Sequence, residues 1–347
     1  MHPPQPIVIL GPTAGGKSDL AVELAQHLRG EVISADSMQV YRHMNAGTAK
    51  PPAQVRQRVP HHLIDVVEPT DRFTVADWLK SAEALIDRMQ RRSTVPIIVG
   101  GTNLYIRALL EGMFDGPGVD QSFREQTADI SAADLHRRLQ TIDPEAAKRI
   151  HPNDRKRIVR ALEVEHVTGQ SISQWQTQWD SDMRQSDAAP SRVNSERRNP
   201  PAVESDHDTT SCYRHNPVLL GLKWSVEAIN RRINQRVRAM FDPDRADSAL
   251  VQALNITESL PAEVLRLYGA GLLGDQAIQA IGYKQLVEHF RGHCDLPEAF
   301  EQTKIVTRRF ARQQRTWMRR FVGITWIDAD ADRTGQVLDK ALSHVSG

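Results

Sequence analysis

Eight residues near the start of the chain, GPTAGGKS at Gly11–Ser18, have the types and the spacing needed to bind a diphosphate. They match the phosphate-loop pattern G-x-x-x-x-G-K-[ST] in full. Glycines let successive backbone N–H groups turn toward an anion, and the N-terminus of a following helix adds partial positive charge. Lys17 can neutralise the terminal phosphate, and the Ser18 hydroxyl can hold a Mg²⁺ ion that bridges two phosphate oxygens. The phosphate loop alone identifies neither the diphosphate nor the bond that breaks.

The segments on both sides of the phosphate loop supply the context that such a loop requires. Ile7–Leu10 is a short apolar run typical of a buried strand, and Asp19–Leu28 has apolar residues at helical spacing. The alternative is a glycine-rich turn with a chance Lys-Ser pair, which would not need this strand–loop–helix order.

Two further strands are predicted in the first third of the chain, at Glu31–Ala35 and Val95–Val99. The first ends at Asp36, and the second ends at Gly100–Thr102, before a helix over about 103–110. Strands that alternate with helices favour a parallel sheet with helices on both faces. Ligands of such sheets bind outside the carboxyl ends of the strands. We therefore expect the phosphate loop, Asp36 and Gly100–Thr102 to face one site.

The remainder of the chain changes character twice. From Ser122 to Trp179 only helical patterns occur, which predicts a helical insertion. Ser181–Asn216 is rich in Ser, Asp, Asn, Arg and Pro with very few aliphatic residues, so it is predicted to be disordered. Val218–Leu222 resumes the sheet, and everything after it is expected to be helical. The predicted parts are an α/β core (1–112 and 217–347), a helical insertion (113–180) and a disordered insert (181–216).

Composition places the chain among ordinary globular proteins. Its 347 residues are 40% hydrophobic and 25% charged, with a formal net charge of +1, and this length suits two domains. Cys212 and Cys294 lie far apart, which indicates neither a disulfide framework nor a metal site and favours a reducing cytosol. The N-terminal segment does not resemble a signal peptide, and no apolar run is long enough to span a bilayer. We therefore expect a cytoplasmic protein without membrane contact.

Two basic clusters favour an anionic polymer as partner. Between Lys304 and Phe321 every charged residue is basic, and helical spacing groups five of these residues on one side. The five are Lys304, Arg308, Arg312, Arg315 and Arg319. The apolar residues expected to pack on the opposite side are Val306, Phe310, Trp317 and Phe321. A second cluster, Arg155–Arg157 with Arg160, follows a helix-start signal at His151–Asp154. Both clusters suit a phosphate backbone, and a solvated basic face is the alternative.

Six further segments make the pattern much more specific than the phosphate loop alone. They read SADSMQVYRHMNAGTAKP (34–51), PHHLIDVVEP (60–69), VPIIVGGTNLYIRALLEG (95–112), HPNDRKRIVRALEV (151–164), QAIGYKQ (279–285) and TRRFARQQRTWMRRF (307–321). In this order and spacing they resemble the bacterial tRNA dimethylallyltransferases. The resemblance covers nearly the whole chain except Ser181–Asn216 and the region around Asp242–Leu260, where this chain carries extra residues.

The resemblance implies a fold, a reaction and partners. It implies a phosphate-loop NTPase-like core with a helical insertion that grips the anticodon stem-loop of a tRNA. The reaction would transfer a dimethylallyl group from dimethylallyl diphosphate, with Mg²⁺, to the exocyclic amine of the adenosine 3′ of the anticodon. We expect a monomer.

The resemblance also assigns roles to residues. Asp36 matches the catalytic aspartate, and a carboxylate can take the proton of the amine as the new bond forms. A turn cap or a Mg²⁺ ligand is the alternative for Asp36. Thr13 is expected to bond the target base or the Asp36 carboxylate, although it could simply satisfy the turn. The residues expected to bind the donor diphosphate are Gly11, Pro12, Thr13, Ala14, Gly15, Gly16, Lys17, Ser18 and Arg232, for which a surface role is equally open.

The positions that match the family's tRNA contacts come from five parts of the chain. They are Asp36, Ser37, Met38, Gln39, Thr102, Arg124, Lys156, Arg157, Ile158, Val159, Arg160, Gln279, Ala280, Ile281, Gly282, Tyr283 and Lys284. Chemistry on a base amine requires the base to leave its stack, so Asp36–Gln39 would contact a flipped-out adenosine.

Three other functions use some of the same features. A small-molecule kinase would use the phosphate loop on ATP, but it does not need a basic helical insertion. An adenylate dimethylallyltransferase would run the same chemistry on a free nucleotide, and the insertion argues against it. An RNA-binding protein without catalysis would not need an intact phosphate loop and Asp36.

Overall fold

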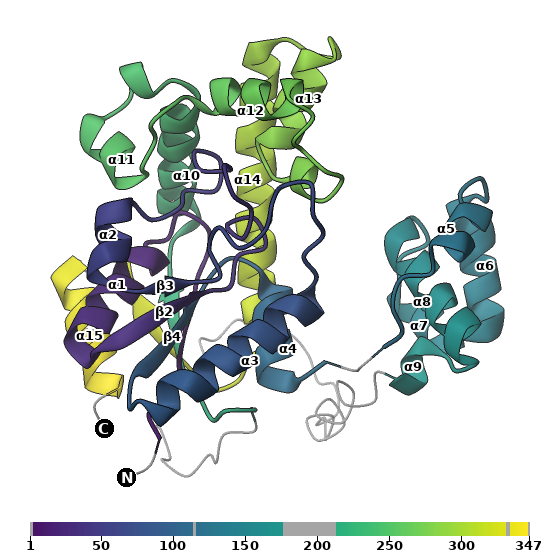
Figure 1. Ribbon diagram of the computed structural model, residues 1–347, viewed down its shortest axis with the longest axis horizontal. Helices are drawn as coiled ribbons and strands as arrows, with labels where there is room; N and C mark the ends of the chain where they lie inside the picture. Colours follow the sequence, from purple (N-terminus) through teal and green to yellow (C-terminus); the bar gives the residue numbers. More distant parts are fainter. Residues whose placement is uncertain (1–2, 114–115, 176–212, 331–333, 346–347) are drawn as a thin grey trace, which may run out of the picture. The chain divides into compact units, whose positions relative to one another are not determined.

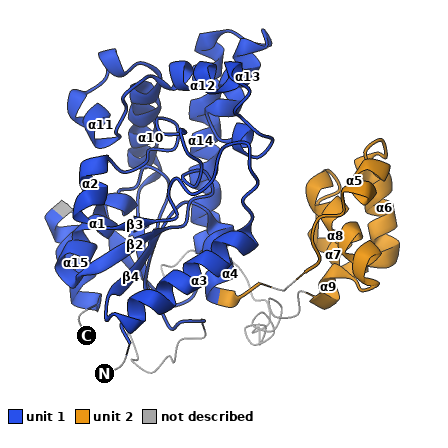
Figure 2. Cartoon of the chain, in the orientation of Figure 1, with its two compact units in different colours: residues 1–110, 207–347 blue, residues 111–206 orange. Residues whose placement is uncertain are grey.

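The computed structural model describes residues 3–113, 116–175, 213–330 and 334–345 (Figure 1). The chain divides into two compact units, which are described separately. Unit 1 comprises residues 1–110 and 207–347, and unit 2 comprises residues 111–206 (Figure 2). Most of the segment predicted to be disordered, 181–216, lies outside the described residues. Its last four residues contradict that prediction, because the Arg214 N–H donates to the Leu110 carbonyl (2.8 Å) and the Arg214 guanidinium pairs with Glu83 (2.6 Å).

Unit 1 is built on a six-stranded sheet in the order β3-β2-β4-β1-β5-β6, and every pair of neighbouring strands is parallel. In sheet order the strands are β3 (His61–His62), β2 (Gly30–Ser34), β4 (Val95–Val99), β1 (Ile7–Leu10), β5 (Val218–Lys223) and β6 (Ile324–Asp328). The central strands are buried on both faces, so they appear in the sequence as continuous apolar runs. The predicted α/β fold with a parallel sheet is confirmed.

Two edge strands were not predicted. β3 has only two residues, both histidines, and β6 has the sequence ITWID with Trp326 45% exposed. The expectation that the chain is entirely helical after Val218–Leu222 was wrong, because an edge strand lacks the continuous apolar run of a central one.

Helices cover both faces of the sheet. α1 (Lys17–Leu28) and α15 (Thr334–Val345) pack together against one face (Figure 1). α3 (Val75–Arg91) packs on β2 and β4 from the other face, where the Trp78 indole donates to the Ser34 carbonyl (2.8 Å). α4 (Asn103–Glu111) lies beside α3, since the rings of Trp78 and Tyr105 stack at 4.7 Å. In the described part of the chain, no helix is both long enough and apolar enough to cross a membrane.

A further group of helices completes unit 1. α10 (Val226–Phe241) packs along α14 (Leu296–Met318), and α13 (Tyr283–Phe290) contacts both α12 (Leu260–Gly269) and α14. The shorter helices are α2 (Ala53–Arg58), α11 (Ser248–Ala253) and the 3₁₀ turns Pro243–Arg245 and Ala277–Gln279.

The basic helix predicted over 304–321 is part of α14, but its faces are rotated from the predicted ones. Its buried side consists of Ala299, Thr303, Ala311, Gln314 and Met318. Arg308 and Arg315, expected on the open basic side, are half-buried, and Trp317 is only half-buried although it was expected in the core. The exposed side carries Arg309, Arg312, Gln313, Thr316 and Arg320. The spacing of apolar residues predicted the wrong buried side, because a polar residue, Gln314, lies at the centre of the side that is buried.

Unit 2 contains only helices among its described residues, as the sequence pattern predicts. They are α5 (Gln121–Gln126), α6 (Ala132–Ile142), α7 (Pro144–Arg149), α8 (Arg155–Thr168) and α9 (Ile172–Trp175). Their apolar sides form one small core that includes Leu135, Leu139, Ile158 and Leu162. The Asp154 side chain accepts from the Arg157 N–H and begins α8, and Gly169, with a positive φ of 70°, ends it.

Candidate active site at the phosphate loop

The phosphate loop joins the carboxyl end of β1 to the first turn of α1, as the sequence predicts. Gly16 caps α1 with a φ of 79°, a conformation that glycine adopts without strain. At Gly15 a Cβ atom would lie 2.8 Å from the Pro12 carbonyl oxygen, so a side chain there would force the turn open. The N-terminus of α1 and the turn before it therefore offer backbone N–H groups to an anion.

Lys17 is nearly buried under this loop, with 8% of its surface exposed. Its Nζ donates to the Pro12 carbonyl oxygen at 2.8 Å. The pKa of Lys17 is lowered to about 8, first by burial and then by the positive charge of Arg236, while the Asp36 carboxylate acts in the opposite direction. The site therefore holds a cation that an incoming anion would stabilise.

α10 brings two arginines to the phosphate loop, in different positions. Arg232 is exposed, donates from Nε to the Ala14 carbonyl (2.7 Å) and lies 4.8 Å over the Trp224 ring. Arg236 donates to the Thr13 hydroxyl (3.4 Å), and burial lowers its pKa while the charge of Asp36 opposes that change. Arg232 therefore braces the outside of the loop, whereas Arg236 lies among the charges of the site. Arg236 was not predicted from the sequence, although it follows Arg232 by one helical turn on the same helix.

Gln314 is a second residue of the site that was not predicted from the sequence. Its side chain is 1% exposed and reaches from α14 to two segments of the site. The Oε1 atom accepts from the Thr13 N–H (2.7 Å), and Nε2 donates to the Gly101 carbonyl (2.8 Å). One amide thus fixes the phosphate loop to the end of β4. The sequence signal was a glutamine in the otherwise basic block at 307–321.

Asp36 follows β2 and faces the same region. Its Oδ1 accepts from the N–H groups of Met38 (2.9 Å) and Gln39 (3.3 Å), which is the capping role weighed as an alternative. No hydrogen bond within the described residues uses Oδ2. This oxygen lies near Gly101, because a Cβ atom at that glycine would be 3.6 Å from it. One carboxylate oxygen therefore holds the turn, and the other remains available to a substrate.

Thr102 and Gln39 stabilise this edge of the sheet. The Thr102 hydroxyl accepts from the Ser37 N–H (2.9 Å), which ties the segment after β2 to the segment after β4. The Gln39 side chain accepts from the Ser34 hydroxyl (3.0 Å) and donates to the Thr48 carbonyl (3.1 Å). The side-chain amide of Gln39, a predicted contact of the flipped-out adenosine, is therefore engaged inside the protein.

The segment Gln279–Lys284 presents few side chains to solvent. Gln279 and Lys284 are exposed, and the Lys284 Nζ donates to the Gln279 side chain (3.3 Å). Tyr283 is fully buried, and its hydroxyl donates to Glu263, whose other oxygen accepts from the N–H groups of Asn45 and Ala46, both at 2.9 Å.

The remaining candidate tRNA contacts, Arg124 and Lys156–Arg160, lie in unit 2. Arg124 (2.7 Å) and Arg160 (2.6 Å) both pair with Glu163, whose side chain is fully buried. Ile158 belongs to the core of unit 2, whereas Lys156 and Arg157 are exposed. Two of these arginines therefore hold unit 2 together, and two cations remain open to solvent.

In unit 1, β1, β2 and β4 bring together the phosphate loop, Asp36 and Thr102, and α10 and α14 add Arg236 and Gln314. This architecture defines the class: an α/β protein with a phosphate loop at the carboxyl ends of a parallel sheet.

The comparisons with known proteins name the family within this class. The IPP transferase family model matches residues 39–321, and the isopentenyl transferase model matches residues 5–65. The tRNA dimethylallyltransferase 2 of Geotalea uraniireducens is 39% identical over 327 residues, 93% of this chain and 91% of the relative. The tRNA dimethylallyltransferase of Geobacillus thermodenitrificans is 37% identical over 347 residues, 98% of this chain and 96% of the relative. The chain belongs to the IPP transferase family.

A solved structure agrees with this assignment. The tRNA isopentenylpyrophosphate transferase of Bacillus halodurans matches with a TM-score of 0.65 at 33% identity. The match covers 99% of this chain and 96% of that chain.

Proposed function

We propose that this chain transfers the dimethylallyl group of dimethylallyl diphosphate to the exocyclic amine of the adenosine 3′ of a tRNA anticodon. The observation that carries this function is the family match, which spans the core and unit 2 together. A kinase or an adenylate dimethylallyltransferase would account for the phosphate loop but not for full-length similarity to tRNA-modifying enzymes.

The donor diphosphate would bind at the phosphate loop. Its developing negative charge is met there by backbone N–H groups at the start of α1 and by two cations, the buried Lys17 and the half-buried Arg236. The geometry supports Arg236 for this role in place of Arg232, whose guanidinium braces the loop from outside. Fixed cations stabilise the leaving group most strongly where water is excluded.

The residues present fit a Mg²⁺ ion that shares the diphosphate. Ser18 is exposed in the first turn of α1, and no hydrogen bond within the described residues uses its hydroxyl. No group of three or more His, Cys, Asp or Glu side chains in that part of the chain could hold a metal ion. Mg²⁺ commonly binds through one or two protein oxygens, water and substrate phosphates, and here the protein oxygen would be that of Ser18. When bound, the ion would neutralise charge on the diphosphate.

The acceptor amine would approach Asp36. As its nitrogen bonds to the allylic carbon, the carbon–oxygen bond to the diphosphate breaks and the amine becomes acidic. The Asp36 Oδ2 atom is the oxygen that takes the proton, because Oδ1 is held by two backbone N–H groups. Gln314 would hold the phosphate loop, where the donor binds, at a fixed distance from the end of β4. Thr102 would hold the segment after β2, which carries Asp36, against the segment after β4.

The exposed cations Lys156 and Arg157 are the residues of unit 2 that we propose for contact with tRNA phosphates. Arg124 and Arg160 would support that surface through Glu163. We propose a monomer that works in the cytoplasm.

The proposed function is tested by incubating the protein with radiolabelled dimethylallyl diphosphate and Mg²⁺ and offering tRNA, AMP or ATP as acceptor. Label should appear in tRNA alone. Label in AMP or ATP would instead identify a free-nucleotide dimethylallyltransferase, and transfer of phosphate from ATP would identify a kinase.

A further inference from the structure

Glu263 of α12 is a buried carboxylate that the reaction described above does not use. Its Oε2 atom accepts from the backbone N–H groups of Asn45 and Ala46, both at 2.9 Å. Its other oxygen accepts from the Tyr283 hydroxyl. A buried charge is unfavourable unless hydrogen bonds of this kind satisfy it. Glu263 therefore joins α12 both to the start of α13 and to the turn at residues 45–50, called here the 45–50 turn.

The 45–50 turn packs directly against α13. A Cβ atom at Gly47 would lie 2.8 Å from the Leu260 Cδ1 atom and closer still to the ring of Tyr283. Only glycine lets the backbone approach a side chain so closely. The tyrosine is fully buried, so its ring has no free space into which it could move. The turn is therefore held at a fixed distance from α13.

A second buried charge holds the same turn. The Lys50 Nζ atom donates to the Asp65 carboxylate (2.6 Å) and to the Asn45 side chain (3.3 Å). It also donates to the Tyr41 carbonyl. Burial lowers the pKa of Lys50, and the hydrogen bond and charge of Asp65 and the charge of Glu263 act against that change. Glu263 therefore holds the first residues of the turn, and Lys50 holds its end.

Gln39 links the 45–50 turn to Asp36. Its Nε2 atom donates to the carbonyl groups of Thr48 (3.1 Å) and Ala49 (3.4 Å), which belong to the turn. Its backbone N–H donates to the Asp36 Oδ1 atom (3.3 Å). A displacement of the turn would therefore move Gln39 and, with it, the Asp36 carboxylate.

We propose that Glu263 is a positioning residue for the transfer reaction: through the 45–50 turn and Gln39 it fixes the Asp36 carboxylate where the acceptor amine meets it. Tyr283 supports this role, because its hydroxyl orients the Glu263 carboxylate. Since Glu263 is buried, it acts only through these contacts and touches no substrate. The inference rests on the proposed function, because it takes Asp36 to be the base of that reaction.

The test measures single-turnover transfer of a radiolabelled dimethylallyl group to tRNA. Glu263→Ala should slow transfer by roughly 10- to 100-fold, since a displacement of about 1 Å at a reaction centre can have an effect of this size. Glu263→Gln should keep most of the rate. Its amide oxygen can accept from Asn45 and Ala46 while its NH₂ group donates to the Tyr283 oxygen, so the same geometry is possible.

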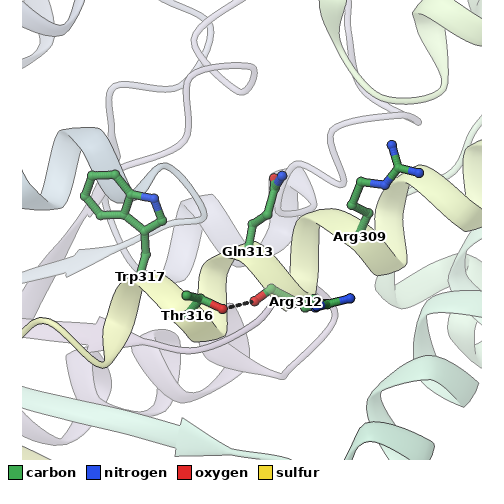
Figure 3. Close-up of a pocket in the computed structure, with 5 residues that line it drawn as sticks. All are labelled: Arg309, Arg312, Gln313, Thr316 and Trp317. Carbon is green, nitrogen blue, oxygen red and sulfur yellow. Dashed lines mark hydrogen bonds between the residues drawn. The ribbon is translucent and has the colours of Figure 1, made fainter. Parts of the chain in front are cut away.

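Binding measurements separate a positioning role from a direct contact. The Kd values for the donor and for tRNA should stay near those of the unmutated protein, because Glu263 presents no surface to either. Exposed polar side chains, such as Arg309 and Gln313 of α14 (Figure 3), are unchanged in this variant. Val264→Ala is the matched control: this neighbour on α12 is also buried, so its truncation should lower the melting temperature but leave the transfer rate normal.

A second variant keeps the test decisive if Glu263→Ala does not fold. Gly47→Ala leaves every hydrogen-bonding side chain in place but pushes the 45–50 turn away from Tyr283. It should also slow transfer, with unchanged Kd values for the donor and for tRNA.

Combination with Asp36→Asn shows whether Glu263 acts through Asp36. The slowing caused by Glu263→Ala should largely disappear once the base has been removed. Equal slowing with and without Asp36 would overturn the proposal, because a general loss of structure predicts it. A normal rate in Glu263→Ala or Gly47→Ala, or a loss in Glu263→Gln as large as in Glu263→Ala, would also overturn it while the proposed function stands. If the unmutated protein labels no tRNA, the proposed function itself fails, and this inference fails with it.

Discussion

At the scale of single residues, the site contains a cation whose burial lowers the stability of the folded protein. Lys17 is buried, and a second cation, Arg236, lies close to it. These surroundings lower the pKa of Lys17 from 10.5 to about 8. Between about pH 8 and 10.5 the unfolded chain still binds this proton, whereas the folded protein has lost it. The buried charge therefore reduces the free energy of unfolding below about pH 8, and this free energy rises as the pH increases through that range. A bound diphosphate would stabilise the protonated form of Lys17 and would offset this loss of stability.

The first prediction concerns the pH dependence of donor binding. We propose that the diphosphate binds the protonated form of Lys17, so its Kd should rise as the pH passes about 8, by up to roughly tenfold per pH unit. Calorimetric titration with inorganic diphosphate between about pH 7 and 9.5 measures this effect. Lys17→Arg, whose charge persists, should bind without the break at about pH 8. An affinity for the unmutated protein that is flat across the range would contradict the placement of the diphosphate beside Lys17.

The second prediction concerns Asp36. Asp36→Asn keeps an oxygen for the N–H groups of Met38 and Gln39 but removes the base, so single-turnover transfer should slow by roughly 10²- to 10⁴-fold. The Kd for the donor should change little. If raising Mg²⁺ restored the rate, Asp36 would be a metal ligand and the assigned role would be wrong.

At the scale of elements, α14 connects the two sides of the site. Gln314 is a buried polar residue in the middle of this long helix, and its amide spans from the phosphate loop to the end of β4. A buried amide with both atoms bonded imposes a particular distance between its partners. The helix therefore sets the spacing between the phosphate loop and the end of β4, where we propose that donor and acceptor bind.

The third prediction follows from this spacing. Gln314→Ala should leave the Thr13 N–H and the Gly101 carbonyl without partners, which destabilises the protein by roughly 1–3 kcal/mol and lowers kcat. Gln314→Glu keeps the acceptor but not the donor, so its effect on kcat should be intermediate. Thermal unfolding and steady-state kinetics measure both effects, with Gln302→Ala, an exposed position on the same helix, as control. A normal kcat in a destabilised Gln314→Ala protein would limit this residue to a structural role.

Local signals in the sequence predicted the elements that meet at the site. The phosphate loop, Asp36 and Gly100–Thr102 each follow an apolar run, and the rule that ligands bind at the carboxyl ends of parallel strands places them together. Arg236 and Gln314 could not be predicted in this way, because they act through contacts with residues more than 200 positions away in sequence. Periodicity shows which side of a helix is apolar, but it does not reveal a buried polar residue whose partners come from elsewhere.

At the scale of the whole molecule, the four basic residues of unit 2 that are candidate tRNA contacts separate into two groups. Arg124 and Arg160 surround the buried carboxylate of Glu163, whose pKa is lowered by these hydrogen bonds although burial acts against them. Lys156 and Arg157 are open to solvent on the first turn of α8. From the sequence all four looked alike, because spacing cannot tell an arginine that pairs with a buried glutamate from one that faces water.

The fourth prediction separates the two groups. Lys156→Glu with Arg157→Glu should raise the Kd for tRNA and flatten its salt dependence by up to roughly 0.9 per lost phosphate contact, while donor affinity stays unchanged. Arg160→Ala should instead destabilise unit 2, because it removes a partner of a buried charge. Filter binding of tRNA across a salt series and thermal unfolding measure the two effects. An unchanged salt slope in the double variant would show that Lys156 and Arg157 form only a solvated face.

The central claim is that unit 1 joins a dimethylallyl group to one particular adenosine of an RNA. The most direct measurement is mass spectrometry of nuclease-digested tRNA after reaction with dimethylallyl diphosphate and Mg²⁺. A single added dimethylallyl group should be found on the adenosine 3′ of the anticodon, and none on a tRNA with guanosine at that position. A modification at several adenosines, or at another nucleotide, would contradict the account.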